Sequence, residues 1–282
     1  MLFICGLPIG NLEDVTQRSL RLMREADFIA AEDTRRTLAL MNVFGIKTPL
    51  ISYHSHNSRT QTERIAALLH EGKNVALVTD AGMPCISDPG AELVARCYEE
   101  NISVSVAPGP SACVTAVALS GFPSDGRFVF EGFLPPKKNA KKERQKRLAG
   151  LAAEQRMVVI YESPHKLAET LADLASCCSG RRAAVVREMT KIYEEVLRGS
   201  IEEIAAHYES NAPRGEFVIV LDAVKENAEK QKEEIDAGRC IELVTGYISD
   251  GDTQMDAIKK TARILNAGKR EVYDIWVGGK KK

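Results

Sequence analysis

The sequence predicts an α/β protein with two α/β domains and a small helical segment near its C-terminal end. The chain has 282 residues, and at roughly 150 residues per domain this length favours two domains. Short apolar runs alternate with helical patterns along most of the chain, which is typical of βαβ units with a largely parallel sheet. From residue 224 on we expect a linker and a small helical domain.

The composition is that of an ordinary globular protein, with 44% apolar and 27% charged residues. The formal net charge of -1 gives no overall basic field, so a nucleic acid would have to be bound by a local patch. The seven cysteines include no CxxC pair, which argues against a disulfide framework or a zinc site and favours a reducing compartment. We find no leader sequence and no apolar run of about 18 residues, and therefore expect a cytoplasmic protein without a membrane segment.

The first domain, a parallel-sheet α/β domain, is predicted over residues 1–124. Its expected strands are Leu2–Cys5, Phe28–Ala31, Leu50–Tyr53, Val75–Thr79 and Val104–Ala107. Its expected helices run from about Val15 to Arg24, through Ile65–Leu69, and over Ala91–Glu99 and Ser111–Leu119. Asn11 and Asp14 have the spacing of a capping box before the first of these helices.

The second α/β domain is predicted over residues 125–223, with the boundary within Ser124–Leu134. Its expected strands are Met157–Tyr161, Ala183–Arg187, Glu194–Arg198 and Phe217–Leu221, and its expected helices are His165–Leu174 and Ile201–His207. Residues 224–282 are predicted to be a linker and a small helical domain. Lys225–Glu234 is expected as a linker or solvated helix, followed by helices near Ile241–Ile248, Met255–Leu265 and Arg270–Val277.

Loops rich in Gly, Pro and carboxylates follow four of the predicted strands of the first domain. They are Gly6–Leu12, Glu32–Arg35, Asp80–Pro84 and Pro108–Ala112. A single loop of this kind is more often a turn than a site. Because ligands of open parallel sheets bind beyond the carboxyl ends of the strands, four such loops at one edge favour a ligand site. We expect Ser87–Gly90, which follows the third loop, to cap and start the next helix.

The residue types in these loops indicate several ways of holding a ligand. Glycine allows close approach of the backbone, and a helix that opens at Pro110-Ser111 would present free N–H groups to a carboxylate. Asp33 and Asp80 could accept hydrogen bonds or balance a cationic ligand. Neither GxxxxGK[ST] nor a strand-bound GxGxxG occurs, so P-loop ATP chemistry and an ordinary NAD site lose support.

The order of these motifs resembles one family, the tetrapyrrole methylase superfamily, in the branch called ribosomal RNA small subunit methyltransferase I. The resemblance extends from about Leu2 to Tyr273. The matching stretches are Gly6–Thr16, Ala30–Arg35, Ser52–Asn57, Val75–Gly90, Pro108–Ala112, Phe130–Pro135, Tyr161–His165 and Arg187–Lys191. Met83 stands where the family usually has Thr, so a side-chain hydroxyl is missing at that position.

The resemblance implies transfer of a methyl group from S-adenosylmethionine to the 2′-hydroxyl of a cytidine in 16S ribosomal RNA. It further implies two α/β domains with the cofactor in the cleft between them, a homodimer, and either the RNA or the assembled small ribosomal subunit as partner. The family's cofactor-binding residues correspond here to Pro8, Gly10, Asp80, Ala81, Gly82, Met83, Pro84, Pro108, Gly109, Pro110, Ser111 and Ala112.

A ribose hydroxyl is a poor nucleophile, so a base within hydrogen-bonding reach would help the reaction. The candidate catalytic residues are Glu32, Asp33, Glu188 and Lys191, and Asp80 is a further candidate base. Structural roles are open alternatives for two of them. Asp33 would serve as the N-cap of the next helix, and Glu188 would pair with a nearby Arg or Lys.

A basic run beside the predicted domain boundary is a candidate RNA contact. The proposed RNA-binding residues are Arg35, Lys137, Lys138, Lys141, Lys142, Arg144, Lys146 and Arg147. A solvated surface segment is the alternative. The last helices, turning at Asn266–Gly268, resemble a helix-turn-helix, and RNA contact or a packing or dimer role both stay open. His54 and His56 lack a third ligand, so no metal site is expected.

Two other functions remain open. A methylase of the same superfamily could act on a tetrapyrrole or another small molecule or on a protein side chain, although the basic run argues against it. A non-enzymatic RNA-binding protein would retain the basic run but would not bind S-adenosylmethionine.

Overall fold

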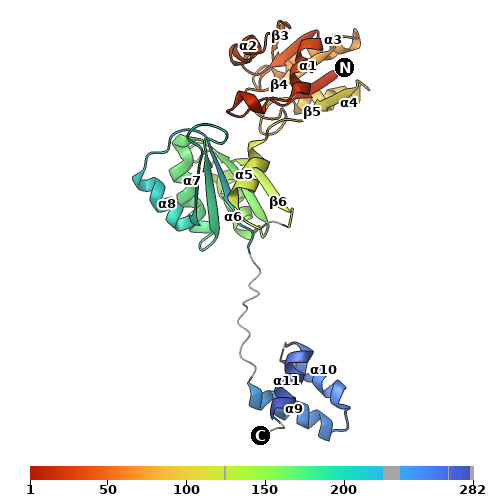
Figure 1. Ribbon diagram of the computed structural model, residues 1–282, viewed down its shortest axis with the longest axis vertical. Coiled ribbons are helices and arrows are strands. Elements are labelled where there is room, and N and C mark those ends of the chain that lie inside the picture. Colours follow the sequence, from red (N-terminus) through yellow and green to blue (C-terminus); the bar gives the residue numbers. More distant parts are fainter. Residues whose placement is uncertain (124, 225–235, 266, 280–282) are drawn as a thin grey trace. The chain divides into compact units, whose positions relative to one another are not determined.

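The computed structural model describes residues 1–123, 125–224, 236–265 and 267–279. The chain forms two compact units, residues 1–224 and residues 225–282, which are drawn in Figure 1. The first unit contains two lobes, and each lobe is built on a five-stranded sheet. The predicted class of two α/β domains followed by helices is therefore confirmed.

The sheet of the first lobe is parallel throughout, as the alternation of strands and helices predicts. Its strands are β1 (Leu2–Cys5), β2 (Phe28–Ala31), β3 (Leu50–Ser52), β4 (Val75–Val78) and β5 (Val104–Ala107), in the order β3-β2-β4-β1-β5. All five coincide with predicted strands to within one residue. Their carboxyl ends share one edge, which places the four predicted loops together.

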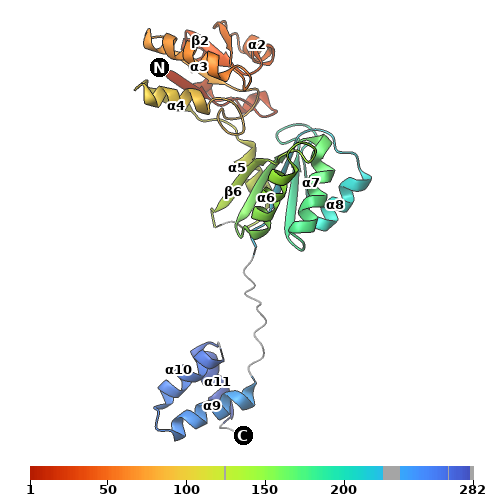
Figure 2. The same cartoon turned by 180° about the vertical axis from the view of Figure 1, so that it is seen from behind.

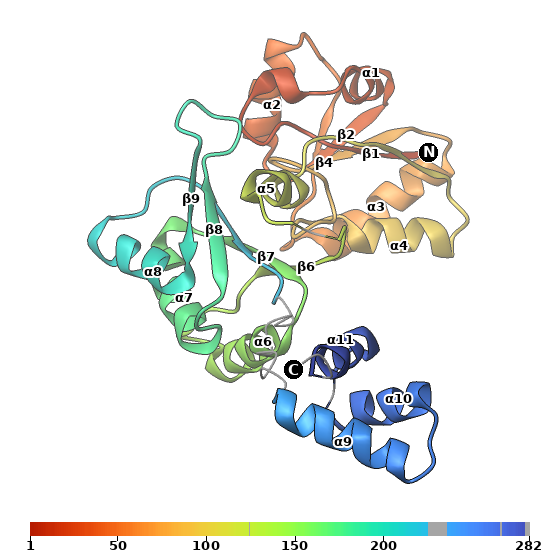
Figure 3. The same ribbon diagram turned by 60° about the horizontal axis from the view of Figure 1, so that its bottom comes forward.

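Helices cover both faces of this sheet, as Figure 3 shows. They are α1 (Gln17–Glu25), α2 (Thr34–Val43), α3 (Ser58–His70) and α4 (Ala91–Glu99). Helices α1 and α2 share one core cluster with the sheet, and α3 and α4 share the other. Since both faces are buried, β4 consists of apolar residues only. No range was predicted for helix α2, which begins with polar residues and buries only Thr37 and Met41, although the N-cap alternative for Asp33 implies a helix at this position.

The predicted capping box before the first helix is wrong in detail, because the 3-10 turn and α1 have separate N-cap residues. Asn11 accepts a hydrogen bond from the Glu13 N–H at 3.0 Å and caps a short 3-10 turn, Leu12–Asp14. Thr16 is the N-cap of α1, and its hydroxyl accepts from the Ser19 N–H at 3.1 Å.

The second lobe has a mixed sheet. Its strands are β6 (Phe128–Phe133), β7 (Met157–Glu162), β8 (Arg182–Arg187), β9 (Glu195–Ser200) and β10 (Phe217–Leu221), in the order β6-β7-β10-β8-β9. Strands β6 and β7 are parallel, and the other pairs are antiparallel. Strand β6, which was not predicted, begins at Phe128, after the predicted limit between residues 124 and 125.

Helices α6 (Lys141–Ala153), α7 (Pro164–Cys177) and α8 (Ile201–Ser210) cover one face of the second sheet. Helix α5 (Ala112–Ser120) covers the other face and buries Cys113 and Ala116 against β7, β8 and β10. Figure 2 shows α5 beside this sheet. The limits 1–124 and 125–223 remain a prediction about folding domains, but α5 packs on the second lobe although it precedes residue 125.

The C-terminal unit consists of α9 (Ala237–Ser249), α10 (Gln254–Ile264) and α11 (Lys269–Gly279). The three helices enclose a common core that includes Cys240, Val244, Ile258 and Trp276. The three predicted helices are confirmed, whereas the expected linker Lys225–Glu234 and Asn266 lie outside the described residues. None of the helices described is both long and apolar enough to cross a membrane.

Candidate functional site

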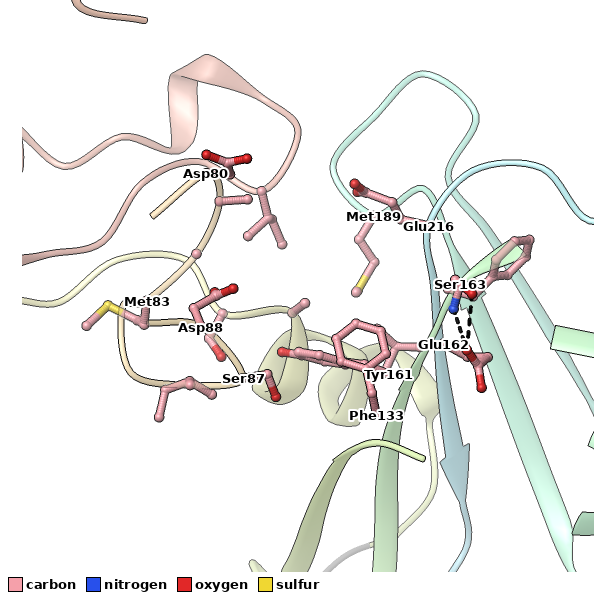
Figure 4. A pocket seen from close by; sticks show the side chains of 18 of the residues that line it. Asp80, Met83, Ser87, Asp88, Phe133, Tyr161, Glu162, Ser163, Met189 and Glu216 are labelled. Atoms are coloured by element: carbon pink, nitrogen blue, oxygen red, sulfur yellow. Dashed lines mark hydrogen bonds between the residues drawn. The ribbon is translucent and has the colours of Figure 1, made fainter. Parts of the chain in front are cut away.

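A pocket of about 430 Å³ lies between the two lobes of the first unit. Its first-lobe wall comes from residues that follow β1, β2 and β4, and its second-lobe wall comes from β6, β7, β10 and the loop after β8 (Figure 4). The start of α5 also lines it. The lining residues are Ile9, Glu32, Arg36, Asp80, Ala81, Gly82, Met83, Ile86, Ser87, Asp88, Ser111, Ala112, Phe133, Tyr161, Glu162, Ser163, Pro164, Met189, Glu216, Phe217 and Val218.

The loops after β1, β4 and β5 are fastened to one another. Leu7 and Gly82 exchange backbone hydrogen bonds of 2.9 and 3.0 Å. The Gly109 N–H donates to the sulfur of Met83 at 3.3 Å. The backbones at Gly6 and Gly109 approach each other closely, since a Cβ on Gly6 would be 2.7 Å from the Gly109 Cα. These contacts hold the proposed cofactor-binding loops in one arrangement.

The predicted cofactor-binding residues divide into two groups. Asp80, Ala81, Gly82, Met83, Ser111 and Ala112 line the pocket. Pro8, Gly10, Pro84, Pro108, Gly109 and Pro110 do not line it and flank the lining residues in the same loops. The N-terminus of α5 faces the pocket, and Ser111, its N-cap, makes no capping hydrogen bond through its side chain.

Three carboxylates from the first lobe line the pocket. Asp80 accepts a hydrogen bond from the Asp33 N–H at 3.0 Å and pairs with Arg36 at 3.1 Å. Glu32 accepts from the Asp80 N–H at 3.4 Å, and burial raises its pKa. The third carboxylate is Asp88, whose pKa is raised to about 7, mainly by burial and further by the charges of Glu32 and Asp80.

Asp88 was not among the predicted site residues. Ser87–Gly90 was expected to cap and start the next helix, and only part of that expectation holds. Gly90 is the N-cap of α4, without a capping hydrogen bond from a side chain. Ser87 and Asp88 line the pocket instead.

The other candidate bases are engaged in hydrogen bonds and ion pairs with neighbouring residues. Asp33 is the N-cap of α2, accepting from the Arg35 N–H at 2.9 Å, and its carboxylate also binds the Arg35 guanidinium at 2.7 Å. The hydrogen bonds and charge of Arg35 keep the pKa of Asp33 well below its usual value. Lys191 lies between Glu188 at 3.0 Å and Glu216 at 2.9 Å. Asp33, Glu188 and Lys191 do not line the pocket.

The second-lobe wall was not predicted from the sequence. Tyr161 and Phe133 form an edge-to-face pair with ring centroids 5.6 Å apart, and burial raises the pKa of Tyr161 to about 12. Glu162 accepts hydrogen bonds from the Ser163 N–H at 2.7 Å and from the Thr170 hydroxyl at 2.6 Å. The sequence signal for Tyr161 and Glu162 was their place at the end of a predicted strand. Ser163 is the N-cap of α7, and Pro164 is its first residue.

The basic run forms the approach to α6 and its first turns. Lys137, Lys138, Lys141, Lys142 and Lys146 are exposed. Arg144 contradicts the prediction of RNA contact, because it is buried and binds Asp173, Thr170 and the Pro135 carbonyl. Arg147 pairs with Glu131. Arg35, which was also predicted to contact RNA, is exposed while it binds Asp33.

Solved methylase structures share the fold of these two lobes. A solved structure of uroporphyrin-III C-methyl transferase from Thermus thermophilus, complexed with S-adenyl homocysteine, has this fold, with a TM-score of 0.56, 16% identity, and coverage of 79% of this chain and 97% of that one. The family model for Tetrapyrrole (Corrin/Porphyrin) Methylases matches residues 1–205.

Curated relatives define the family more closely. The ribosomal RNA small subunit methyltransferase I of Thermotoga maritima is 50% identical over 220 residues, which cover 78% of this chain and 97% of that protein. The protein of the same name from Halalkalibacterium halodurans is 43% identical over 276 residues, covering 98% and 94%. The chain therefore belongs to the tetrapyrrole methylase family, in the ribosomal RNA small subunit methyltransferase I branch.

Proposed function

We propose that this protein transfers a methyl group from S-adenosylmethionine to the 2′-hydroxyl of a cytidine in 16S ribosomal RNA. The observation that supports this most strongly is the 43% identity over 98% of the chain to a ribosomal RNA small subunit methyltransferase I. The homodimer that the resemblance implies and the expected cytoplasmic location belong to the same proposal.

The pocket has the chemistry that S-adenosylmethionine requires. Its acidic residues Glu32 and Asp80 suit ribose hydroxyls and a positively charged ligand. The start of α5, where the Ser111 side chain makes no capping hydrogen bond, can present N–H groups to a carboxylate. Apolar side chains such as Ile9 and Met189 can contact the adenine and the methylene groups.

When bound, the cofactor supplies an electrophilic methyl group, and the protein's contribution is orientation. The fastened loops at Leu7, Gly82 and Gly109 provide a rigid wall for that purpose. Aligning the two reactants can lower the barrier by roughly 7–11 kcal/mol. The second-lobe residues Tyr161 and Phe133 close the pocket on the opposite side.

Methyl transfer from the labelled cofactor to purified small ribosomal subunits or their RNA tests the proposal. We expect transfer to assembled subunits, to free 16S RNA, or to both, when these come from cells that lack the protein. Binding of the cofactor without transfer to either would contradict the proposed substrate, and transfer to a tetrapyrrole or protein would support the alternative methylase. If calorimetry shows no cofactor binding, the non-enzymatic alternative gains support.

Changing Lys138, Lys141, Lys142 and Lys146 together to Gln should weaken RNA binding at physiological ionic strength by about tenfold or more. These exposed cations gather around the start of α6. For every lysine that no longer binds a phosphate, RNA binding should release about one counterion fewer, and its salt dependence should fall accordingly. Filter binding at several salt concentrations measures both the affinity and its salt dependence.

A control variant changes the same number of exposed cations on the first lobe, Lys47, Arg59, Arg64 and Lys73, also to Gln. Equal losses in the two variants would show that only the overall charge matters, and the assignment of the basic run to RNA binding would then be wrong.

A further inference from the structure

Asp88 differs from the other acids that line the pocket. Asp80 is held by Arg36 and by a backbone N–H, and Glu162 by Thr170 and Ser163. Glu32 accepts a backbone N–H, and Glu216 pairs with Lys191. Within the described part of the chain, Asp88 is the acid of this pocket for which neither a hydrogen bond nor an ion pair is found.

The loop that presents Asp88 has a tightly defined backbone. Cys85 and Ser87 both adopt left-handed conformations, with φ of 72° and 63°, and such strained residues persist only where the surroundings impose them. The Cys85 N–H donates to the Pro89 carbonyl at 3.3 Å and closes the loop. A Cβ on Gly90 would lie 2.7 Å from the Cys85 sulfur, so the loop is also closely packed. Figure 4 shows the Asp88 side chain directed toward the space between the lobes.

Titratable groups on several elements face Asp88. Glu32 follows β2 and Asp80 follows β4, and the charges of both oppose ionisation of Asp88. Tyr161 on β7 and Cys85 in the same loop are close enough for their pKa values to be raised by the Asp88 charge, in addition to the larger effect of burial. Arg36 also lines the pocket, but its guanidinium is paired with Asp80.

We propose that Asp88 is the catalytic base that accepts the proton of the attacking 2′-hydroxyl, an inference that rests on the proposed function. The 2′-oxygen forms a bond to the methyl carbon while the carbon–sulfur bond breaks and its electron pair remains on sulfur. The hydroxyl proton passes to a carboxylate oxygen of Asp88. Charge and atoms balance, because the sulfonium becomes a neutral thioether as the carboxylate becomes a neutral acid.

The candidate bases outside the pocket are poorly suited to this step. The carboxylate of Asp33 is bound to Arg35, and its lowered pKa makes it a weak base. For Lys191, burial lowers the pKa, but the hydrogen bonds and charges of Glu216 and Glu188 outweigh this and raise it overall. Lys191 is therefore protonated and has no lone pair with which to accept a proton.

The pKa of Asp88, raised to about 7 by burial and by the neighbouring charges, is well matched to base catalysis near neutral pH. Because the deprotonated carboxylate is the active form, kcat/KM should be low below pH 7, rise through about pH 7, and level off above it. A carboxylate with an ordinary pKa near 4 would give no rise in this range.

Asp88→Asn is the decisive variant, measured in the full-length protein with unmethylated small subunits, or with 16S RNA if that is the substrate that the wild type methylates. We expect kcat to fall by about 10²- to 10⁴-fold. The cofactor Kd should change by less than about threefold, and the rise of residual activity through pH 7 should disappear. Asp88→Glu, which keeps a carboxylate, should recover part of the rate and of the pH dependence. Asp125→Asn, at an exposed site, is the matched control and should behave as the wild type.

Single-turnover rates within about threefold of the wild type for Asp88→Asn would overturn the proposal, because general bases contribute far more than this. An increase in cofactor Kd with unchanged kcat would also overturn it, since Asp88 would then only bind the cofactor. Calorimetric cofactor binding by the variant shows that it is folded. Absence of transfer by the wild type itself would instead contradict the proposed function, and the role of Asp88 would fall with it.

Discussion

Gly6→Ala should bind S-adenosylmethionine about 10- to 100-fold more weakly than the wild type. The new Cβ would lie 2.7 Å from the Gly109 Cα and 2.8 Å from the Gly109 nitrogen, and neither backbone atom can rotate away. Overpacking of this kind costs about 1–3 kcal/mol, and each 1.4 kcal/mol changes a binding constant about tenfold. The cost should appear in cofactor binding, because Met83 lines the pocket and Gly109 lies two residues before the lining residue Ser111.

Isothermal titration of the cofactor measures this effect, and Gly150→Ala is its matched control. Gly150 lies within α6, and an added Cβ there meets nothing within 4 Å. The control should bind the cofactor normally and gain up to about 1 kcal/mol in the free energy of unfolding from improved helix propensity. Unchanged cofactor affinity in Gly6→Ala would mean that the loops after β1 and β5 do not form the cofactor site.

Arg181→Met should lower the free energy of unfolding by about 3–5 kcal/mol, because three carbonyls lose their charged donor and each unsatisfied buried group costs roughly 1–3 kcal/mol. Arg181 is only 8% exposed. Its guanidinium donates to the carbonyls of Asp222 at 2.6 Å, Arg156 at 2.5 Å and Glu154 at 3.1 Å. These hydrogen bonds connect the start of β8 to the end of α6, the start of β7 and the end of β10. Methionine at position 181 would leave the three carbonyls without this donor.

The neighbouring residue provides the comparison. Arg182 has a side chain that is 56% exposed and lies 3.9 Å from Asp222, so Arg182→Met should cost less than about 1 kcal/mol. At roughly 2–4 °C per kcal/mol for a unit of this size, the melting temperature of Arg181→Met should fall by about 10 °C. Similar losses in the two variants would contradict the structural role given to Arg181.

The sequence predicted nine of the ten strands in the described structure to within two residues at either end. Most of these strands are short apolar runs bounded by polar or Gly-containing turns, which is the pattern that burial on both faces produces. Strand β6 was missed because Glu131 and Gly132 interrupt its apolar residues, and the register shifts at this point. Helix α5 has apolar residues on all sides, so no periodicity indicates which sheet it covers.

The candidate site could be predicted from the sequence only on its first-lobe side. Loops that follow parallel strands meet at one edge, and this rule located Glu32, Asp80 and the start of α5. The rule does not show which residues of the second lobe face that edge, so Tyr161 and Met189 were not assigned to the site. Asp88 was missed because its sequence neighbours favour a helix start, whereas its role depends on which way the loop turns.

Arg144 shows that a charge run can conceal a structural residue. It shares a helix face with Leu148 and Leu151, at the i, i+4 and i+7 positions of an inward-facing stripe. That spacing was a usable signal that Arg144 is directed inward, where it binds Asp173 and Thr170. The exposed Lys142 and Lys146 on the same helix do not share this spacing with the leucines.

The identity of the methylated nucleoside tests the central claim most directly. After reaction of the wild-type protein with labelled cofactor and its RNA substrate, nuclease digestion and mass spectrometry should find the label in one nucleoside, 2′-O-methylcytidine. The adjoining phosphodiester bond should resist alkaline cleavage, because its 2′-hydroxyl is blocked. Label on a cytosine base, on another nucleoside or on a ribosomal protein would contradict the account.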